Sequence, residues 1–156
     1  MDTRKVKFPK RVSEEEREEV LSYLEERFGI EKFHWRSYEI LKGSLNYWLF
    51  PKNPYLELLA NLQVQTVGLL FLRRVSKYLK PTSAFLQRFG YLANKNIVEL
   101  TSEEIKILKE KQKIKKDLSL EPGYIILKKG DLILGCGLWV SGNIIAYLET
   151  KVLKNI

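Results

Sequence analysis

The chain has 156 residues, of which 45% are hydrophobic and 29% are charged, so it can build a folded core and is excluded from the disordered class. Its formal net charge of +8 favours a polyanionic partner such as nucleic acid or an acidic membrane surface, although charge can also serve solubility alone. The single cysteine, Cys136, excludes an intrachain disulfide framework and is expected to be a buried structural thiol.

The N-terminal part predicts a basic segment followed by an acidic helix. Five cations precede residue 12 and would form an RNA-contacting arm or first strand, or else a solvated tail. Ser13 is expected to cap the helix in a capping box with Glu16, and Gly29 to end it. The seven glutamates between Glu14 and Glu26 favour a polar face over a metal site, and this face should point away from any phosphate backbone.

Residues 33–50 alternate apolar and polar side chains, which predicts a β-hairpin with one face buried against the preceding helix. Exposed aromatic side chains there could stack on bases, whereas buried ones would fill the core. His34, the sole histidine, is expected to be a surface or internally satisfied side chain. Beyond Pro54 the sequence favours a short helix over 55–60 and one or two central strands over 62–72, with Gly68 at a bulge or bend.

The span from Leu58 to Val98 contains no aspartate or glutamate but carries six cations. Because acidic partners are missing locally, this block is expected to be part of an anion-binding surface. Its members are Arg73, Arg74, Lys77, Lys80, Arg88 and Lys95. A helix is predicted over 84–93, and residues 94–96 are expected to join it to a C-terminal module.

The stretch from Asn96 to Leu148 predicts a strand, a helix and a three-strand meander. Residues 97–100 are apolar and β-branched, and residues 101–104 suit a helix start. After Pro122, glycine-containing turns at 128–131 and 141–143 separate apolar runs, as in antiparallel hairpins. The sheet of such a small unit is expected to curl into a little barrel closed by the helix.

That order resembles the PUA domain, the pseudouridine synthase and archaeosine transglycosylase module that binds structured RNA. The resemblance covers about a third of the chain. It rests on the strand at Ile97–Leu100, the helix start at Glu103-Glu104, the return strand from Leu118 to Leu127, and Leu134-Gly135-Cys136-Gly137, which is similar to the family's LGxG strand. The chain departs from the family at Glu110 and Lys111, where many PUA domains have a glycine.

A compact α/β domain before such a unit resembles the two-domain ribosome-biogenesis factors of the Nip family. The segment from Lys80 to Leu100 is similar to the linker and PUA-like tail of Nop/Sun-type RNA cytosine-5 methyltransferases. These resemblances imply an α+β protein with an N-terminal α/β pre-PUA-like domain, residues 1–95, followed by a small mixed β-barrel PUA-like domain, residues 96–156. They imply RNA docking without methyltransferase chemistry, because the sequence has no methyltransferase domain.

The sequence offers few groups for catalysis. There is one histidine and one cysteine, and no Walker loop or G-x-G-x-x-G motif occurs. Glu39 and Glu57 could serve a hydrolase, but no fixed spacing singles them out. We therefore expect no enzymatic activity, no cofactor and no metal.

Membrane insertion is not expected either. No apolar run reaches the roughly 20 residues that span a bilayer, and the N-terminus lacks an apolar signal core. We therefore expect a cytoplasmic protein without a membrane partner.

The hypothesis from sequence is a non-enzymatic RNA-binding protein that docks on structured rRNA or tRNA, in ribosome biogenesis or RNA modification. Phosphates would be held by cations from both halves, and the bare backbone at Gly135 and Gly137 would let a nucleotide approach. The cations are Arg73, Arg74, Lys77, Lys80, Arg88, Lys106, Lys109, Lys113, Lys115 and Lys116. The alternative is a protein–protein adaptor that delivers RNA to a separately encoded RNA methyltransferase or meets ribosome-assembly factors, with residues 35–48 as an exposed apolar patch.

Overall fold

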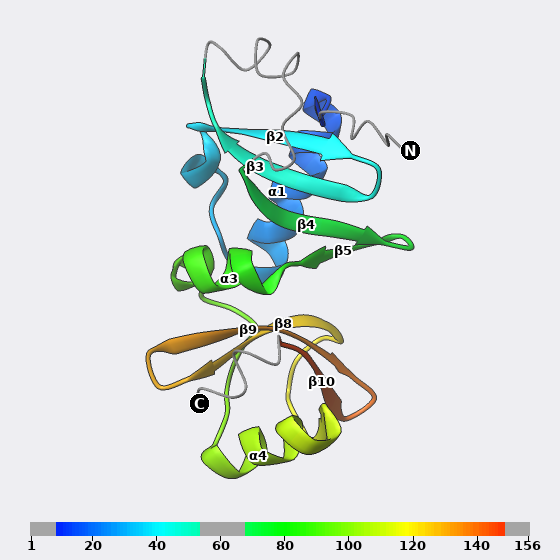
Figure 1. Cartoon of the computed structure of the whole chain (residues 1–156), viewed down its shortest axis with the longest axis vertical. Coiled ribbons are helices and arrows are strands. Elements are labelled where there is room, and N and C mark those ends of the chain that lie inside the picture. The colour runs from blue at the N-terminus through cyan, green and yellow to red at the C-terminus, as the bar shows by residue number, and fades with distance from the viewer. Residues whose placement is uncertain (1–8, 54–67, 149–156) are drawn as a thin grey trace, which may run out of the picture. The chain divides into compact units, whose positions relative to one another are not determined.

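The computed structural model describes residues 9–53 and 68–148, which form parts of two compact units (Figure 1). The first unit comprises Met1–Glu26 and Ile30–Lys80, and the second comprises Arg27–Gly29 and Pro81–Ile156. Each unit has its own five-stranded sheet accompanied by helices, so the predicted α+β class is confirmed. The division falls at residues 80/81, whereas the sequence predicts it at 95/96, because α3 (Ser83–Phe89) packs against a strand of the second unit.

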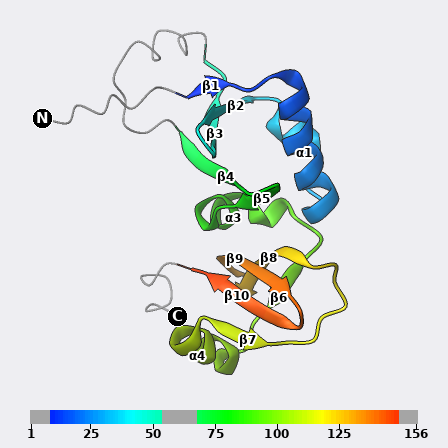
Figure 2. The ribbon, with the colours of Figure 1, turned by 90° about the vertical axis from the view of Figure 1, so that its right-hand side faces the viewer.

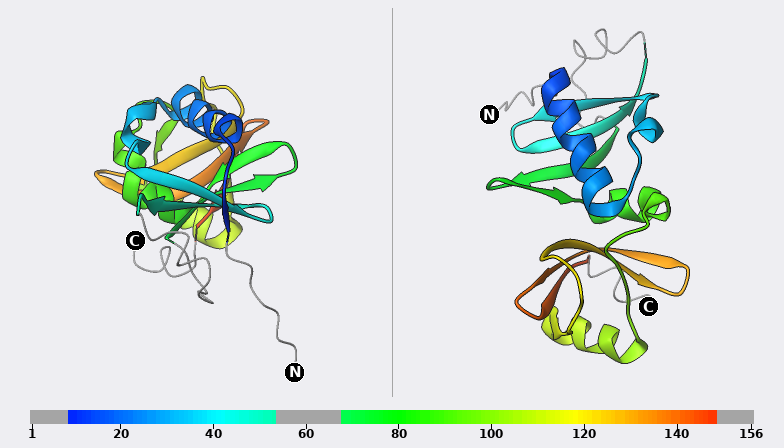
Figure 3. Two further views of the ribbon diagram at one scale, coloured as in Figure 1. Left: turned by 90° about the horizontal axis from the view of Figure 1, so that it is seen from above. Right: turned by 180° about the vertical axis from the view of Figure 1, so that it is seen from behind.

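The sheet of the first unit is covered on one face by α1 (Glu14–Phe28), as Figures 2 and 3 show. Its strands follow the order β1 (Lys10–Arg11), β2 (Tyr38–Gly43), β3 (Asn46–Pro51), β4 (Leu69–Val75) and β5 (Tyr78–Pro81). Buried side chains of α1, including Val20 and Leu24, provide the apolar stripe that the sequence predicts. On the opposite face, Trp48 and Phe50 pack around the buried Leu41.

The predicted hairpin over 33–50 is confirmed as β2 and β3, but its first residues are not in a strand. They form a 3₁₀ helix, η1 (Lys32–Trp35), which places the Trp35 ring in the core, with its centroid 6.3 Å from that of Phe71. The strand predicted over 62–72 is confirmed from Leu69 onward, while 62–67 and the helix predicted over 55–60 lie outside the described residues. Gly68 lies in a bend directly before β4, with a φ of +64°, so the predicted bulge or bend is confirmed there. The pairing of β3 with β4 also shifts register, between Tyr47 and Trp48.

The second unit has a mixed sheet whose two edge strands are joined by a helix. The strands follow the order β6 (Ile97–Glu99), β8 (Gly123–Lys129), β9 (Leu132–Val140), β10 (Asn143–Tyr147) and β7 (Lys113–Lys115). Strand β6 runs parallel to β8, and the other pairs are antiparallel. Because α4 (Ser102–Lys111) lies between β6 and β7 in the chain, it must pass from one edge of the sheet to the other.

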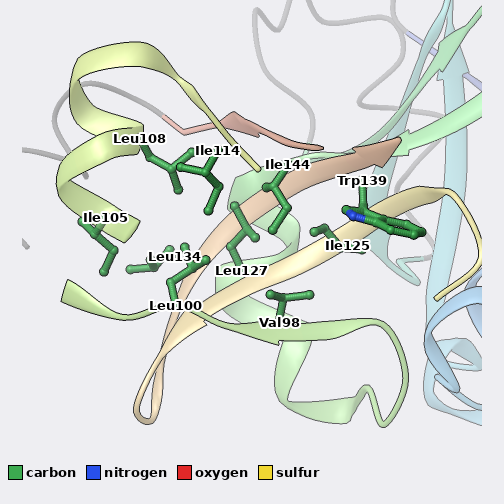
Figure 4. Packing of buried hydrophobic residues seen from close by; sticks show 10 residues of the cluster. All are labelled: Val98, Leu100, Ile105, Leu108, Ile114, Ile125, Leu127, Leu134, Trp139 and Ile144. Carbon is green, nitrogen blue, oxygen red and sulfur yellow. The ribbon is translucent and has the colours of Figure 1, made fainter. Parts of the chain in front are cut away.

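The core of the second unit lies between α4 and the sheet. Figure 4 shows Ile105 and Leu108 pointing from α4 toward the apolar side chains of the strands, and both are buried. Burying a side chain of this size stabilises a fold by about 2 kcal/mol. Thr101 begins α4 in a capping box, in which its hydroxyl accepts from the Glu104 amide while the Glu104 carboxylate accepts from the Thr101 amide. The predicted helix start is thereby confirmed.

Candidate nucleic-acid interface

Two adjacent arginines on β4 have opposite surroundings. Arg73 is exposed, whereas Arg74 is partly buried and reaches α1. The Arg74 guanidinium donates to the Glu19 carboxylate at 2.9 Å and to the Tyr47 hydroxyl at 3.0 Å. Neighbouring side chains on a strand point to opposite faces, so only one of the two arginines can face the helix.

Arg74 belongs to a charge network that also includes Lys42 and Glu16. Glu16 accepts from the Lys42 ammonium at 2.8 Å and from the Tyr47 hydroxyl at 2.6 Å. These hydrogen bonds, from Lys42 first and then Tyr47, lower the pKa of Glu16, while burial and the nearby Glu16 raise the pKa of Tyr47.

This network corrects two expectations from the sequence. Glu16 was expected to close a capping box with Ser13, yet its carboxylate binds Lys42 and Tyr47, although Ser13 does cap the helix by accepting from the Glu16 amide. Arg74 was expected to belong to an anion-binding surface because the block from 58 to 98 has no acidic residue of its own, yet α1 supplies a carboxylate partner from a distant part of the chain. We therefore interpret Arg74 as a structural cation.

The other predicted RNA-binding cations between residues 58 and 98 differ in exposure. Lys77, in the turn, is exposed, and its ammonium lies 5.5 Å from the centroid of the Tyr78 ring. Lys80 is partly buried in β5. Arg88, in α3 of the second unit, is exposed with its guanidinium 5.3 Å from the centroid of the Phe89 ring.

In the second unit, lysines follow α4 and β7. Lys106 and Lys109 are exposed on α4 and, being three residues apart, share a helix face. Lys113 and Lys115 flank the buried Ile114 on β7, so both point away from the core. The sequence hypothesis missed one further exposed cation, Lys111, in the last turn of α4; the run of lysines there was the available signal.

Lys116, by contrast, is held by the fold. Its ammonium donates to both Glu104 carboxylate oxygens, at 2.9 and 2.8 Å, and its carbonyl accepts from the Trp139 indole at 3.0 Å. Burial by itself would raise the pKa of Glu104, but the hydrogen bonds from Lys116 and Thr101 outweigh it and the pKa is lowered. Lys116 ties the capping box of α4 to the segment after β7.

The two glycines proposed to admit a nucleotide are buried. A Cβ at Gly135 would lie 2.5 Å from the Ser83 hydroxyl oxygen, and one at Gly137 would lie 2.9 Å from a methyl carbon of Leu127. Ser83 explains the close approach, because its hydroxyl donates to the Tyr147 carbonyl at 2.8 Å and accepts from the Cys136 amide at 3.0 Å. The expectation of nucleotide access at these glycines is therefore wrong, because α3 and core side chains fill the space beside them.

Besides the exposed Arg88 and Lys111, two sets of exposed residues remain as candidate contacts. We name Arg73, Val75, Lys77 and Tyr78 the hairpin surface, and Lys106, Lys109, Lys113 and Lys115 the lysine surface. The first belongs to the first unit and the second to the second unit. The expectation that cations of both halves form one track stays a prediction.

Comparison with known proteins does not assign this chain to a family. Neither a protein-family model nor a curated protein matches the chain. The resemblance to PUA proteins therefore stays a prediction. Within the part of the chain that the structure describes, no helix is both long and apolar enough to cross a membrane.

Proposed function

We propose that the protein binds RNA through its exposed cations and has no catalytic role of its own. The observation that carries this proposal is the lysine surface. Lys106, Lys113 and Lys115 are exposed, and no carboxylate among residues 9–53 and 68–148 forms an ion pair with them. Point charges of this kind attract phosphates regardless of sequence, so affinity should fall steeply as salt is raised.

The second unit supports a finer proposal, a PUA-like module preceded by a pre-PUA-like domain. Its chain order is strand β6, helix α4, short strand β7 and antiparallel meander β8–β10, which contains the order on which the resemblance rests and adds β7. Helix α4 passes between the edge strands β6 and β7, which suits a small barrel closed by a helix. Structured rRNA and tRNA are accordingly the first RNAs to test, with ribosome biogenesis and RNA modification as the proposed settings.

A competing explanation for the lysines is protection of the sheet edge. Lysines on an exposed edge strand discourage pairing with another chain, and β7 is an edge strand. That role explains Lys113 and Lys115 but does not extend to Lys106 on α4. The two explanations differ in one measurable consequence, namely whether the lysines contribute to RNA affinity.

Fluorescence anisotropy with labelled tRNA and rRNA fragments, repeated over a range of salt, tests the proposal. The triple variant K106Q/K113Q/K115Q should reduce the slope of log affinity against log salt by roughly 2, because each lost phosphate contact removes about 0.7–0.9. The matched control is R36Q/K52Q/K129Q, which removes the same charge elsewhere and should keep most of the slope. Equal effects of the two triple variants, or no binding by the unmodified protein, would refute the proposal.

A further inference from the structure

An exposed aromatic side chain lies beside the turn of the β4–β5 hairpin, whose two strands Figure 1 shows running to a tight bend. Tyr78, the first residue of β5, is 58% exposed, and Val75, the last residue of β4, is 45% exposed. Only Ser76 and Lys77 separate them, so they stand opposite each other across the ribbon and share one face. In the same unit, the rings of Trp35, Tyr47 and Phe71 are buried at 0% exposure.

Cations border this exposed pair. Arg73 lies two residues before Val75 on β4 and is exposed, so it shares the face of Val75. Lys77 places its ammonium near the Tyr78 ring, which still keeps more than half of its surface exposed. Within 9–53 and 68–148, no carboxylate forms an ion pair with Arg73 or Lys77.

The opposite face of the hairpin is already occupied. Arg74 points to the Tyr47 hydroxyl and to Glu19 of α1. The ribbon therefore separates two kinds of cation: one stabilises the packing of the helix on the sheet, and the other is left at the surface together with an aromatic ring. The exposed Tyr78 ring between two cations gives this surface an aromatic platform, which charged side chains alone do not supply.

We propose that the hairpin surface captures an unpaired nucleotide, with the base stacked on Tyr78 and the adjacent phosphates held by Arg73 and Lys77. This inference rests on the proposed RNA-binding function and names the class of RNA that this surface selects. Every base offers a π-face, so stacking is tolerant of sequence, but in a duplex both faces of a base are already stacked. The surface therefore prefers single-stranded segments such as loops, bulges and ends.

The experiment compares three variants of the full chain: Y78A, Y78F and the control Y91A, whose tyrosine is 73% exposed in the second unit. Two probes are used, a short oligoadenylate with 2-aminopurine at its centre and a self-complementary RNA duplex of equal length. Y78A should weaken oligoadenylate binding roughly fivefold to 150-fold and abolish the quenching of 2-aminopurine, since stacking contributes about 1–3 kcal/mol per base. Y78F and Y91A should bind and quench like the unmodified protein, and all variants should bind the duplex equally.

Other outcomes separate this inference from the proposed function. If the unmodified protein binds oligoadenylate in a salt-dependent way but Y78A binds and quenches equally well, the stacking role is refuted and RNA binding stands. If the unmodified protein binds neither RNA, both proposals fall. If Y78A weakens binding of polyglutamate as much as it weakens binding of oligoadenylate, the surface docks acidic protein segments, and base capture is refuted.

Discussion

The hairpin surface and the lysine surface are both positively charged, with two and four cations respectively, but they differ in which side chains accompany the charge. The first places Arg73 and Lys77 beside an exposed tyrosine, whereas the lysine surface consists of ammonium groups on α4 and the edge strand β7. A guanidinium and an aromatic ring can recognise flat groups, while an ammonium acts as a point charge. Under the proposed function, the lysine surface would supply affinity for any phosphate backbone, and the hairpin surface would supply preference for unpaired bases.

Both regions also show that neighbouring cations can have different roles. Arg74 and Lys116 are bound by carboxylates at 2.9 and 2.8 Å, while Arg73 and Lys115, next to them in sequence, are exposed. The alternation of side chains along extended backbone assigns one member of each pair to the fold and the other to solvent. Substitutions at the two members should therefore have different effects.

The largest expected effect tests whether the strand around Gly135 belongs to the core. G135A should lower the free energy of unfolding by about 3 kcal/mol, because the new methyl meets Ser83 and the backbone φ of +147° disfavours a side chain. Urea denaturation followed by circular dichroism measures this. The matched control is G130A, with φ of +59° and no atom within 4 Å of the new Cβ, which should cost only about 1 kcal/mol. A stable G135A with reduced RNA affinity would restore the nucleotide role of this glycine.

The next effect distinguishes the two arginines of β4. R74A should cost about 2 kcal/mol of stability, because it removes the hydrogen bonds to Tyr47 and Glu19. R73A should change stability by no more than about 0.5 kcal/mol. Denaturant midpoints of the two variants, measured side by side, check this ordering. Equal midpoints would contradict the assignment of Arg74 to the fold.

A smaller effect depends on pH and concerns Glu104. Its pKa is lower in the folded protein than in the unfolded chain, for which 4.5 is the reference, so the unfolded state binds the extra proton as the solution is acidified. The stabilisation is complete above the reference pKa and is lost as pH falls through the lower folded value. The free energy of unfolding of E104Q should therefore be lower than that of the unmodified protein at neutral pH, by about 1 kcal/mol. This difference in stability should shrink below pH 4.5.

Thermal melts of both proteins from neutral to acidic pH give this comparison. K116Q should reproduce part of the same loss, since Lys116 is the partner that lowers the pKa of Glu104. T101A is the control for the cap alone and should cost about 1 kcal/mol without the same pH dependence. A difference between E104Q and the unmodified protein that grows on acidification would contradict the sign.

Local patterns allowed much of the fold to be predicted from the sequence. The cap at Thr101 and the glycine-containing turns before Leu132 and Asn143 depend on neighbouring residues, and they lie where expected. The 3₁₀ helix over Lys32–Trp35 was missed because burial of Trp35 against Phe71 depends on a strand far along the chain. The approach of Ser83 to Gly135 likewise joins distant residues, so glycines that suggested an open backbone are packed.

The candidate site was predictable only as a count of charges. The acidic partner of Arg74 comes from α1, and that of Lys116 comes from the start of α4. The sequence does not indicate which cation each carboxylate pairs with. Tyr78 was not singled out, because its exposure depends on its position next to the turn of an edge hairpin. Side chains alternate between the two faces of a strand, and this rule, applied to Arg73 and Arg74, could have separated the surface cation from the structural one.

The smallest effect compares Lys115 with Lys116. K115Q should leave stability within about 0.5 kcal/mol of the unmodified protein and reduce the salt slope of RNA binding by about 0.7–0.9, the share of one phosphate contact. K116Q removes the same charge but breaks the ion pair with Glu104, so it should lower stability and leave the slope almost unchanged. Anisotropy titrations at several salt concentrations, combined with thermal melts, separate the two variants. Each variant removes one positive charge, so a salt slope that depended only on net charge would change equally in K115Q and K116Q. Equal changes would contradict the proposal that the lysine surface contacts RNA phosphates.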